Sequence, residues 1–203
     1  MTKIFRFRHI QKDGKDFLEL TDDLAALNKA YAELFVQRYK DDPRGTFTTG
    51  SDPREMGYGI LGQRMFQSLL NQYRIPYIHD EPAFKFEEDR LISDFMIPGF
   101  GSIDVKTRLW NTDTLIIRRN AWDSYVKRGE VPNFVVALRL TQEEKIAEIM
   151  GYAHGAEVKN WPNNPHICIR SPCHSKLYDE LAPFSEIFTK LKALGIKETF
   201  EWC

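Results

Sequence analysis

The sequence predicts an α/β domain in which helices flank a central mixed β-sheet. Residues 54–73 repeat apolar side chains at helical spacing, which predicts an amphipathic helix. Residues 91–98 and 103–110 have the composition of strands, and the turn between them contains glycines that can take left-handed backbone angles, which is typical of a β-hairpin. Residues 133–140 are rich in Val and Leu, and such a run suits a central strand that is buried on both faces.

Shorter patterns complete a single domain. We expect a helix from residue 21 to about residue 39 and a loop at 41–53. We also expect strands at 76–78, 115–117 and 148–152, a short helix at 122–127, and an amphipathic helix at 178–194. A chain of 203 residues suits one well-cored domain over 1–203. Within it we expect a nuclease-like core at about 54–158, an N-terminal extension at 1–53 and a C-terminal helical extension at 160–203.

Composition excludes several classes of protein. No apolar run approaches the roughly 20 residues that a membrane helix needs, and the first residues lack the apolar core of a signal peptide, so we expect a cytoplasmic protein without a membrane partner. The 28 basic residues are balanced by 29 acidic ones, so a nucleic-acid partner would need a local basic face. The three cysteines, an odd number, are expected to be free thiols.

The residues that carry chemistry lie on the predicted hairpin. Side chains on a strand alternate between faces, so Asp104, Lys106 and Arg108 should share one side while Ile103 and Val105 face the core. Asp94 precedes the turn by nearly the number of residues by which Asp104 follows it. Antiparallel pairing would therefore bring the two carboxylates close together, beside the ammonium of Lys106.

Two adjacent carboxylates repel each other, and a divalent cation removes that conflict. Mg²⁺ takes oxygen ligands, commonly one or two protein carboxylates, and leaves its other positions to waters and phosphate oxygens. Its bound water becomes a nucleophile, and a nearby lysine can position or deprotonate that water and offset phosphate charge. Hydrolysis of phosphodiester bonds is the reaction that this chemistry serves.

This arrangement resembles a known family. Asp94, a gap of nine residues, and then Asp104-Val105-Lys106 resemble the PD-(D/E)xK signature of the restriction-endonuclease-like nucleases, and the resemblance extends over about 59–152. It implies a restriction-endonuclease-like fold and a Mg²⁺- or Mn²⁺-dependent endonuclease acting on DNA through a metal-activated water. It also implies that Asp94, Asp104 and the Val105 carbonyl hold the metal and that Lys106 is catalytic.

The sequence departs from the family pattern at two positions. Ser93 stands where the family often has proline. Gln63 stands where many members carry a glutamate on the first core helix, and its carbonyl could bind a water on the metal but adds no charge. Glu55 or Glu81 could take the place of this missing glutamate as an acidic group at the site. Gln63 is therefore a candidate site residue, and it also favours an alternative, a catalytically degenerate nuclease fold that serves as a nucleic-acid-binding or assembly module.

Three other interpretations compete with this one. Asp94, Asp104 and Lys106 could be a charge cluster on a solvent-facing sheet. Residues 57–62 satisfy the dinucleotide-binding pattern G-x-G-x-x-G, but no buried strand precedes them, so their glycines are better explained by close helix packing. Four residues could bind zinc, but their spacing is unfavourable: His166, Cys168, Cys173 and His174. We therefore interpret them as buried thiols and surface histidines.

Several residues near the hairpin could contact a nucleic acid. Basic residues at and beyond the hairpin could bind phosphates, although a charge run is more often a solvated face: Arg108, Arg118, Arg119, Lys127 and Arg128. The N-terminal segment adds Arg6, Arg8, Lys12 and Lys15. Trp110 and Trp122 could stack on bases, but core packing is the commoner role of tryptophan. One centre cuts one strand, so cutting a duplex would call for a homodimer.

Overall fold

The computed structural model describes residues 7–20, 53–79, 93–141, 146–163 and 172–195. Within them, seven strands form one mixed sheet in the order β1-β2-β8-β7-β5-β4-β3, and two strands form a separate antiparallel pair. The sheet strands are β1 (Phe7–Lys12), β2 (Lys15–Leu20), β3 (Ile78–His79), β4 (Phe95–Ile97), β5 (Gly101–Leu109), β7 (Phe134–Leu140) and β8 (Ile146–His154). The pair consists of β6 (Thr114–Arg118) and β9 (Cys173–Leu177). Neighbouring strands of the sheet are antiparallel except β5 and β7, which are parallel.

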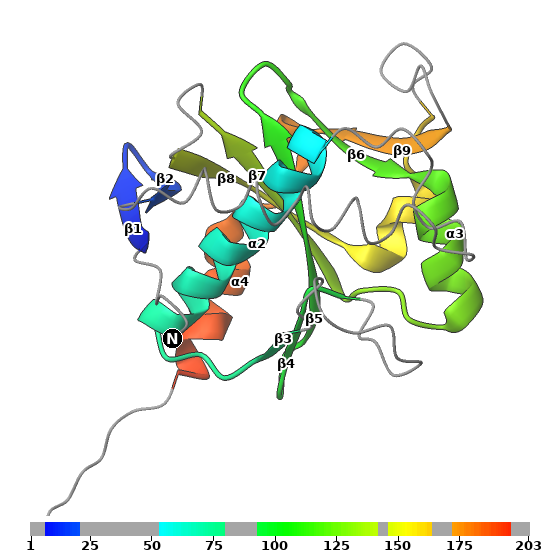
Figure 1. Cartoon of the computed structure of the whole chain (residues 1–203). Coiled ribbons are helices and arrows are strands. Elements are labelled where there is room, and N and C mark those ends of the chain that lie inside the picture. The colour runs from blue at the N-terminus through cyan, green and yellow to red at the C-terminus, as the bar shows by residue number, and fades with distance from the viewer. Residues whose placement is uncertain (1–6, 21–52, 80–92, 142–145, 164–171, 196–203) are drawn as a thin grey trace, which may run out of the picture.

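Helices cover both faces of the sheet. They are α2 (Pro53–Gln72), α3 (Arg119–Arg128) and α4 (Phe184–Ala193), with two short 3₁₀ segments, η1 (Gly155–Asn160) and η2 (Tyr178–Glu180). In Figure 1, α2 and α4 lie on one side of the central strands, and α3 lies on the other side with the β6–β9 pair. The predicted α/β class, with a mixed sheet between helices, is confirmed, and no described helix is long and apolar enough to span a membrane.

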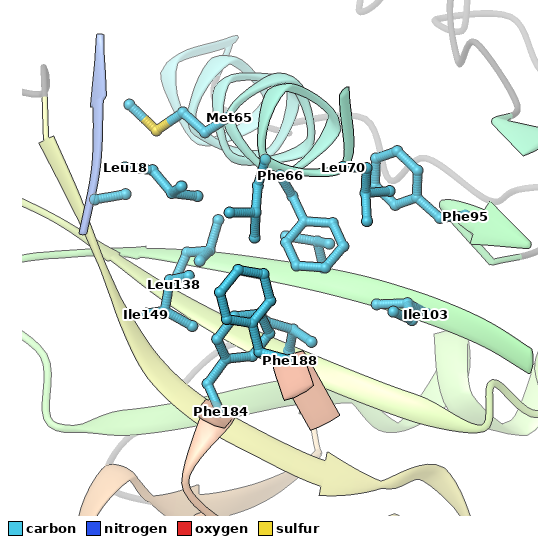
Figure 2. Packing of buried hydrophobic residues seen from close by; sticks show 14 of the residues in the cluster. Leu18, Met65, Phe66, Leu70, Phe95, Ile103, Leu138, Ile149, Phe184 and Phe188 are labelled. Carbon is cyan, nitrogen blue, oxygen red and sulfur yellow. The ribbon is translucent and has the colours of Figure 1, made fainter. Parts of the chain in front are cut away.

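The face of the sheet toward α2 holds the larger apolar core. Figure 2 shows Phe66 of α2 extending over the sheet toward Phe184 and Phe188 of α4. The rings of Phe66 and Phe184 are 6.2 Å apart and meet edge to face, and Phe66 also contacts Phe95 of β4 at 5.4 Å. Burial of such side chains contributes roughly 2 to 3 kcal/mol each, so this layer fixes α2 on the strands.

Gly62 allows α2 to lie directly on β5. A Cβ atom at Gly62 would come within 1.8 Å of the Thr107 side-chain oxygen, so a larger residue would force the Thr107 side chain or the helix to shift. This contact supports the interpretation that the glycines serve close packing, although nothing lies within 4 Å of the equivalent position at Gly59. Residues 57–62 are helical throughout, so they do not form the strand-to-helix turn of a dinucleotide site.

The opposite face of the sheet is also covered. Leu115 and Ile117 of β6 and the fully buried Trp122 of α3 pack against Val135 and Ala137 of β7. In the parallel register, Val135 stands beside Asp104 of β5 and Ala137 beside Lys106. Because paired residues on adjacent strands point to the same face, Asp104 and Lys106 lie under this second layer and not on an open sheet surface.

The N-terminal hairpin is part of the main sheet, because β2 pairs with β8. A hydrogen-bonded group of four side chains joins this hairpin to the end of α2, and we call it the His9 cluster: His9, Gln11, Asp16 and Tyr73. The Nδ1 and Nε2 atoms of His9 lie 2.9 Å from the Tyr73 hydroxyl and from Asp16 Oδ1, respectively, and Gln11 donates to the same Asp16 oxygen at 2.9 Å. The hairpin is thereby tied to α2 through polar contacts.

Aromatic packing closes the His9 cluster from the side of α4. The Phe188 ring lies 5.2 Å from the His9 ring and 4.9 Å from the Tyr73 ring, both edge to face. Burial, with a smaller contribution from the charge of Asp16, raises the pKa of the Tyr73 hydroxyl. The phenol therefore keeps its proton and stays a neutral hydrogen-bonding group at neutral pH.

The C-terminal part of the chain differs from the prediction. The helix expected at 178–194 is divided, because Ala182 exchanges two backbone hydrogen bonds with Tyr152 of β8, at 2.9 and 3.0 Å. Pro183 then stands directly before α4 as its N-cap residue, and its missing N–H makes it unsuited to a helix interior. The predicted helix at 21–39 and the predicted loop at 41–53, except its last residue, lie outside the described residues.

The cysteine and histidine predictions also need correction. Cys173 is disulfide-bonded, so the expectation of free thiols is wrong for this residue. His174 is buried, and not a surface histidine as expected. The other residues of the proposed zinc group, His166 and Cys168, lie outside the described part of the chain, as does Cys203.

Candidate metal centre and active site

Asp94 stands directly before β4, where its carboxylate meets β5. The antiparallel ladder of β4 and β5 pairs Phe95 with Ile103, and Asp94 lies one residue beyond that pair. Its Oδ2 atom accepts a hydrogen bond of 2.7 Å from the backbone N–H of Val105. The side chain therefore continues the strand pairing that the backbone has ended. This contact brings Asp94 against the Asp104-Val105-Lys106 segment, as the hairpin geometry predicts.

Gln63, on helix α2, contacts the same carboxylate. Its side-chain amide donates a hydrogen bond of 2.6 Å to Asp94 Oδ1. Gln63 follows Gly62, which lies against Thr107 of β5, and its side chain contacts the residue directly before β4. The orientation of this amide directs its carbonyl oxygen away from Asp94, which leaves that oxygen available as an acceptor.

Asp104 and Lys106 form a buried ion pair on β5. Asp104 is only 1% exposed, which excludes the interpretation of a surface charge cluster for this residue. Lys106 Nζ donates to Oδ1 at 2.9 Å and lies 2.7 Å from Oδ2. The angle at Oδ2 is unsuitable for a hydrogen bond, so this buried oxygen has no hydrogen-bond partner among the described residues. We call Gln63, Asp94, Asp104 and Lys106 the carboxylate–lysine cluster.

The electrostatics of the carboxylate–lysine cluster keep Lys106 charged. Burial by itself would lower the pKa of Lys106, but the attraction of Asp104, with smaller contributions from Tyr125 and Asp94, raises the pKa well above its usual range. Lys106 is therefore an ammonium ion at neutral pH. Two carboxyl groups face this single cation, so the cluster has acidic groups in excess of its basic group.

The cluster offers few oxygen atoms to a divalent cation. Mg²⁺ commonly takes one or two protein carboxylates, and Asp104 Oδ2 is a buried oxygen that lacks a hydrogen-bond partner. In the described ranges, no three His, Cys, Asp or Glu side chains gather into a group that could hold a metal. Glu81 and the side chain of Glu55 lie outside the description, and the role of the Val105 carbonyl stays a prediction.

Tyr125 of α3 is a component of this site that the sequence did not reveal. It packs edge to face on Trp122 at 5.7 Å and contacts the apolar layer that includes the neighbours of Asp104 and Lys106 on β7. The charge of Asp104, the largest influence, raises the pKa of the Tyr125 hydroxyl to about 12. Tyr125 therefore faces the carboxylate–lysine cluster from the second layer, as a hydroxyl that keeps its proton at neutral pH.

The predicted substrate contacts fall into different environments. The two arginines at the junction of β6 and α3 and the two basic residues in the last turn of α3 are exposed: Arg118, Arg119, Lys127 and Arg128. Arg8 and Lys15 form ion pairs with Glu19 and Glu148, far along the sheet from β5. Of the two tryptophans, Trp122 is buried in the core, as expected, whereas Trp110 is 53% exposed.

Comparisons with known proteins add no family to this description. No family model matches the chain, and a search of curated proteins returns no relative. The resemblance to PD-(D/E)xK nucleases therefore rests on the residues of the hairpin and on their geometry.

Proposed function

We propose that the chain is a metal-dependent nuclease that hydrolyses phosphodiester bonds in DNA and that its sheet and helices form a restriction-endonuclease-like fold. One observation carries the proposal. The Asp94 carboxylate contacts the Val105 amide at 2.7 Å, between the acid and the lysine of the Asp104-Val105-Lys106 segment. This contact supports the proposal, because the resemblance implies two carboxylates and one ammonium at the end of one strand pair.

The residues of the cluster divide the chemistry between them. In hydrolysis, the oxygen of a water forms a bond with phosphorus, and the sugar oxygen leaves and takes a proton. The Lys106 ammonium can donate hydrogen bonds to a phosphate oxygen and offset the negative charge that builds there. Asp104 holds Lys106 in place through the contacts at 2.9 and 2.7 Å. Gln63 fixes Asp94 and can accept a hydrogen bond through its carbonyl oxygen.

Asp94 and Asp104 would hold Mg²⁺ or Mn²⁺, with the Val105 carbonyl as a further ligand. The bound cation would supply Lewis acidity toward a water and neutralise phosphate charge. The described part of each chain offers one such centre, so we propose that duplex cutting requires a homodimer.

A second candidate is a nuclease-like fold that binds nucleic acid without cutting it. It is favoured by the hydrogen bonds of the cluster, because Asp94 already accepts one bond at each oxygen, from Gln63 and from Val105. A carboxylate satisfied in this way gains less from a metal. Titration calorimetry with Mn²⁺ separates the candidates, because uptake of the ion that Asp104→Asn abolishes is expected only of the nuclease.

The direct test is cleavage of a labelled DNA duplex by the purified chain. We expect cleavage with Mg²⁺, none with EDTA, and recovery when Mn²⁺ is added. Asp104→Asn and Lys106→Met should each lower the rate by on the order of a thousand-fold, because each removes a charge at the reacting phosphate.

Asp123→Asn is the matched control for these variants. Asp123 is an exposed acid on α3, so its loss should leave the rate unchanged. Equal cleavage by the wild type and both cluster variants would reveal a contaminating enzyme and defeat the proposal. Absence of cleavage in the wild type, with DNA binding retained, would support the second candidate instead.

A further inference from the structure

A graded row of side chains follows β5 away from the carboxylate–lysine cluster. Asp104, Lys106 and Arg108 alternate onto one face of the strand. Asp104 is 1% exposed, the Lys106 side chain is 29% exposed, and Trp110, directly after the strand, is 53% exposed. At about 3.3 Å per residue, Trp110 stands roughly 13 Å from Lys106 along the strand direction. The row therefore leads from a buried centre to an exposed aromatic side chain.

Arg108 carries a positive charge that no described acid balances. In the parallel register it stands beside Arg139 of β7, and like charges side by side destabilise a sheet. Arg139 pairs with Glu148, whereas no described acidic side chain lies within ion-pair distance of Arg108. Arg108 Nε is buried without a hydrogen-bond partner among the described residues, while the side chain as a whole stays partly exposed. Such a guanidinium suits a phosphate group.

Trp110 is held on a tight turn. Thr112 bonds the Leu109 carbonyl twice, through its backbone N–H at 3.2 Å and through its hydroxyl at 2.9 Å. The turn fixes the backbone at Trp110 and so the point from which the exposed indole extends. An aromatic platform next to a basic side chain is the usual arrangement for binding an unpaired nucleotide.

We propose that Arg108 and Trp110 form a nucleotide-binding subsite for unpaired DNA beside the cleavage centre, an inference that rests on the proposed nuclease function. Arg108 binds a phosphate, and Trp110 stacks on a base. The occupant is unpaired because the bases inside a duplex are already stacked on both faces. At about 3.4 Å per stacked nucleotide, the subsite lies roughly four nucleotides from Lys106. The substrate is thus a duplex with an overhang, a frayed end or a branch.

A protein partner is the less suitable occupant of this surface. Arg108, Arg139 and Lys106 lie in the same region as Trp110, and an unbalanced charge is costly to bury against an apolar partner. A nucleotide chain supplies both an anion and an aromatic ring, so it suits both residues together.

The test is DNA binding in EDTA, measured by fluorescence anisotropy with a labelled oligothymidine of about 12 nucleotides. Trp110→Ala should raise the Kd about ten-fold or more, and Trp110→Phe should raise it by much less because a ring remains. Arg108→Gln should raise the Kd and lower the slope of log Kd against log salt by about one. A blunt duplex with the same label should show little effect of Trp110→Ala.

Ile78→Ala is the matched control, because Ile78 of β3 is 56% exposed at the edge of the sheet, and it should leave the Kd unchanged. An unchanged Kd in Trp110→Ala would overturn the inference, and so would an equal loss for blunt duplex and oligothymidine. Self-association that Trp110→Ala abolishes would also overturn it by assigning the residue to a protein interface. If the wild type binds oligothymidine through Trp110 but cleaves nothing, the nuclease proposal fails and the subsite stands. If the wild type cleaves and Trp110→Ala binds normally, only the subsite fails.

Discussion

Two polar groups of opposite design contact α2 at different points along its length. The His9 cluster lies at its C-terminal end, and the carboxylate–lysine cluster meets it near its middle, through Gln63. In the His9 cluster, none of the buried side-chain polar atoms lacks a hydrogen-bond partner, and aromatic rings enclose the group. In the carboxylate–lysine cluster, Asp104 Oδ2 is buried without a hydrogen-bond partner among the described residues, although it lies 2.7 Å from the Lys106 ammonium. One cluster is complete within the chain. In the other, one buried carboxylate oxygen lies in an ion pair without a hydrogen bond.

This difference separates a structural role from a functional one. A buried polar network that satisfies all of its members rigidifies the fold, whereas a partly satisfied one costs free energy. The His9 cluster connects the N-terminal hairpin to α2 and α4 and needs nothing from outside. The carboxylate–lysine cluster leaves one buried oxygen outside the hydrogen bonds of the described residues, which is the reason to look for function there.

The strongest way to break this comparison is to neutralise the second cluster as a pair. Asp104→Val with Lys106→Met removes both charges, and replacing a buried ion pair by apolar residues is often neutral for stability, while removing one partner costs about 3 to 5 kcal/mol. We expect cleavage to fall by on the order of a thousand-fold with nearly unchanged stability, measured by cleavage and urea unfolding. Lost stability in the double variant would give the pair a structural role.

The reverse result is expected for the His9 cluster. Asp16→Ala leaves His9 and Gln11 without their shared acceptor, which should lower the free energy of unfolding by about 2 to 3 kcal/mol. The cleavage rate at a temperature where the variant is folded should not change. Urea unfolding measures the stability and a cleavage assay measures the rate. Slower cleavage by the folded variant would contradict a purely structural role of the His9 cluster.

Tyr125 provides a finer test of the difference between the two clusters, because only its position assigns it to the carboxylate–lysine cluster. Tyr125→Phe keeps the packing on Trp122 and removes a hydroxyl that can donate to a phosphate oxygen. We expect cleavage to slow about ten-fold with a stability change below about 1 kcal/mol. Tyr77→Phe is the matched control, since that hydroxyl bonds Asn71. Wild-type rates in both variants would limit Tyr125 to packing.

The smallest effect concerns Glu148, another satisfied carboxylate beside the hairpin. Burial raises the pKa of Glu148. The hydrogen bonds and charges of Lys15 and Arg139 together lower it by more than burial raises it, so the folded-state pKa lies below the ordinary 4.5. A depressed pKa contributes stability above the unfolded-state pKa, and this contribution is lost as pH falls through the folded value. Glu148→Gln should therefore be less stable than the wild type at pH 7. Urea unfolding should find a smaller difference in the free energy of unfolding between the two proteins at pH 3. An equal difference at both pH values would contradict the assignment of this stability to the ionised Glu148 carboxylate.

The sequence predicts the parts of the site that depend on local rules. Alternation along β5 correctly separates Ile103 and Val105 from Asp104 and Lys106, because the period of a strand is a property of its own backbone. The predicted helix at 54–73 matches α2 within one residue, because the helical period is likewise a local property of the chain. The nearness of Asp94 to β5 follows from a short turn, which leaves few possible registers.

The rest depends on contacts between distant segments. Tyr125 reaches the cluster because α3 folds over the second face, and no local pattern gives that direction. The pairing of β2 with β8 joins residues more than a hundred positions apart, which alternation within either strand cannot specify. The division of the last helix follows from the hydrogen bonds of Ala182 with Tyr152, which also lie outside any local window.

The contact between Asp94 and the Val105 amide gives the chain an internal reporter. Any ion that draws electron density from that carboxylate weakens the hydrogen bond that protects the Val105 amide proton. The exchange rate of this one proton with solvent, followed by nuclear magnetic resonance, would therefore register occupancy of the centre before any substrate is known.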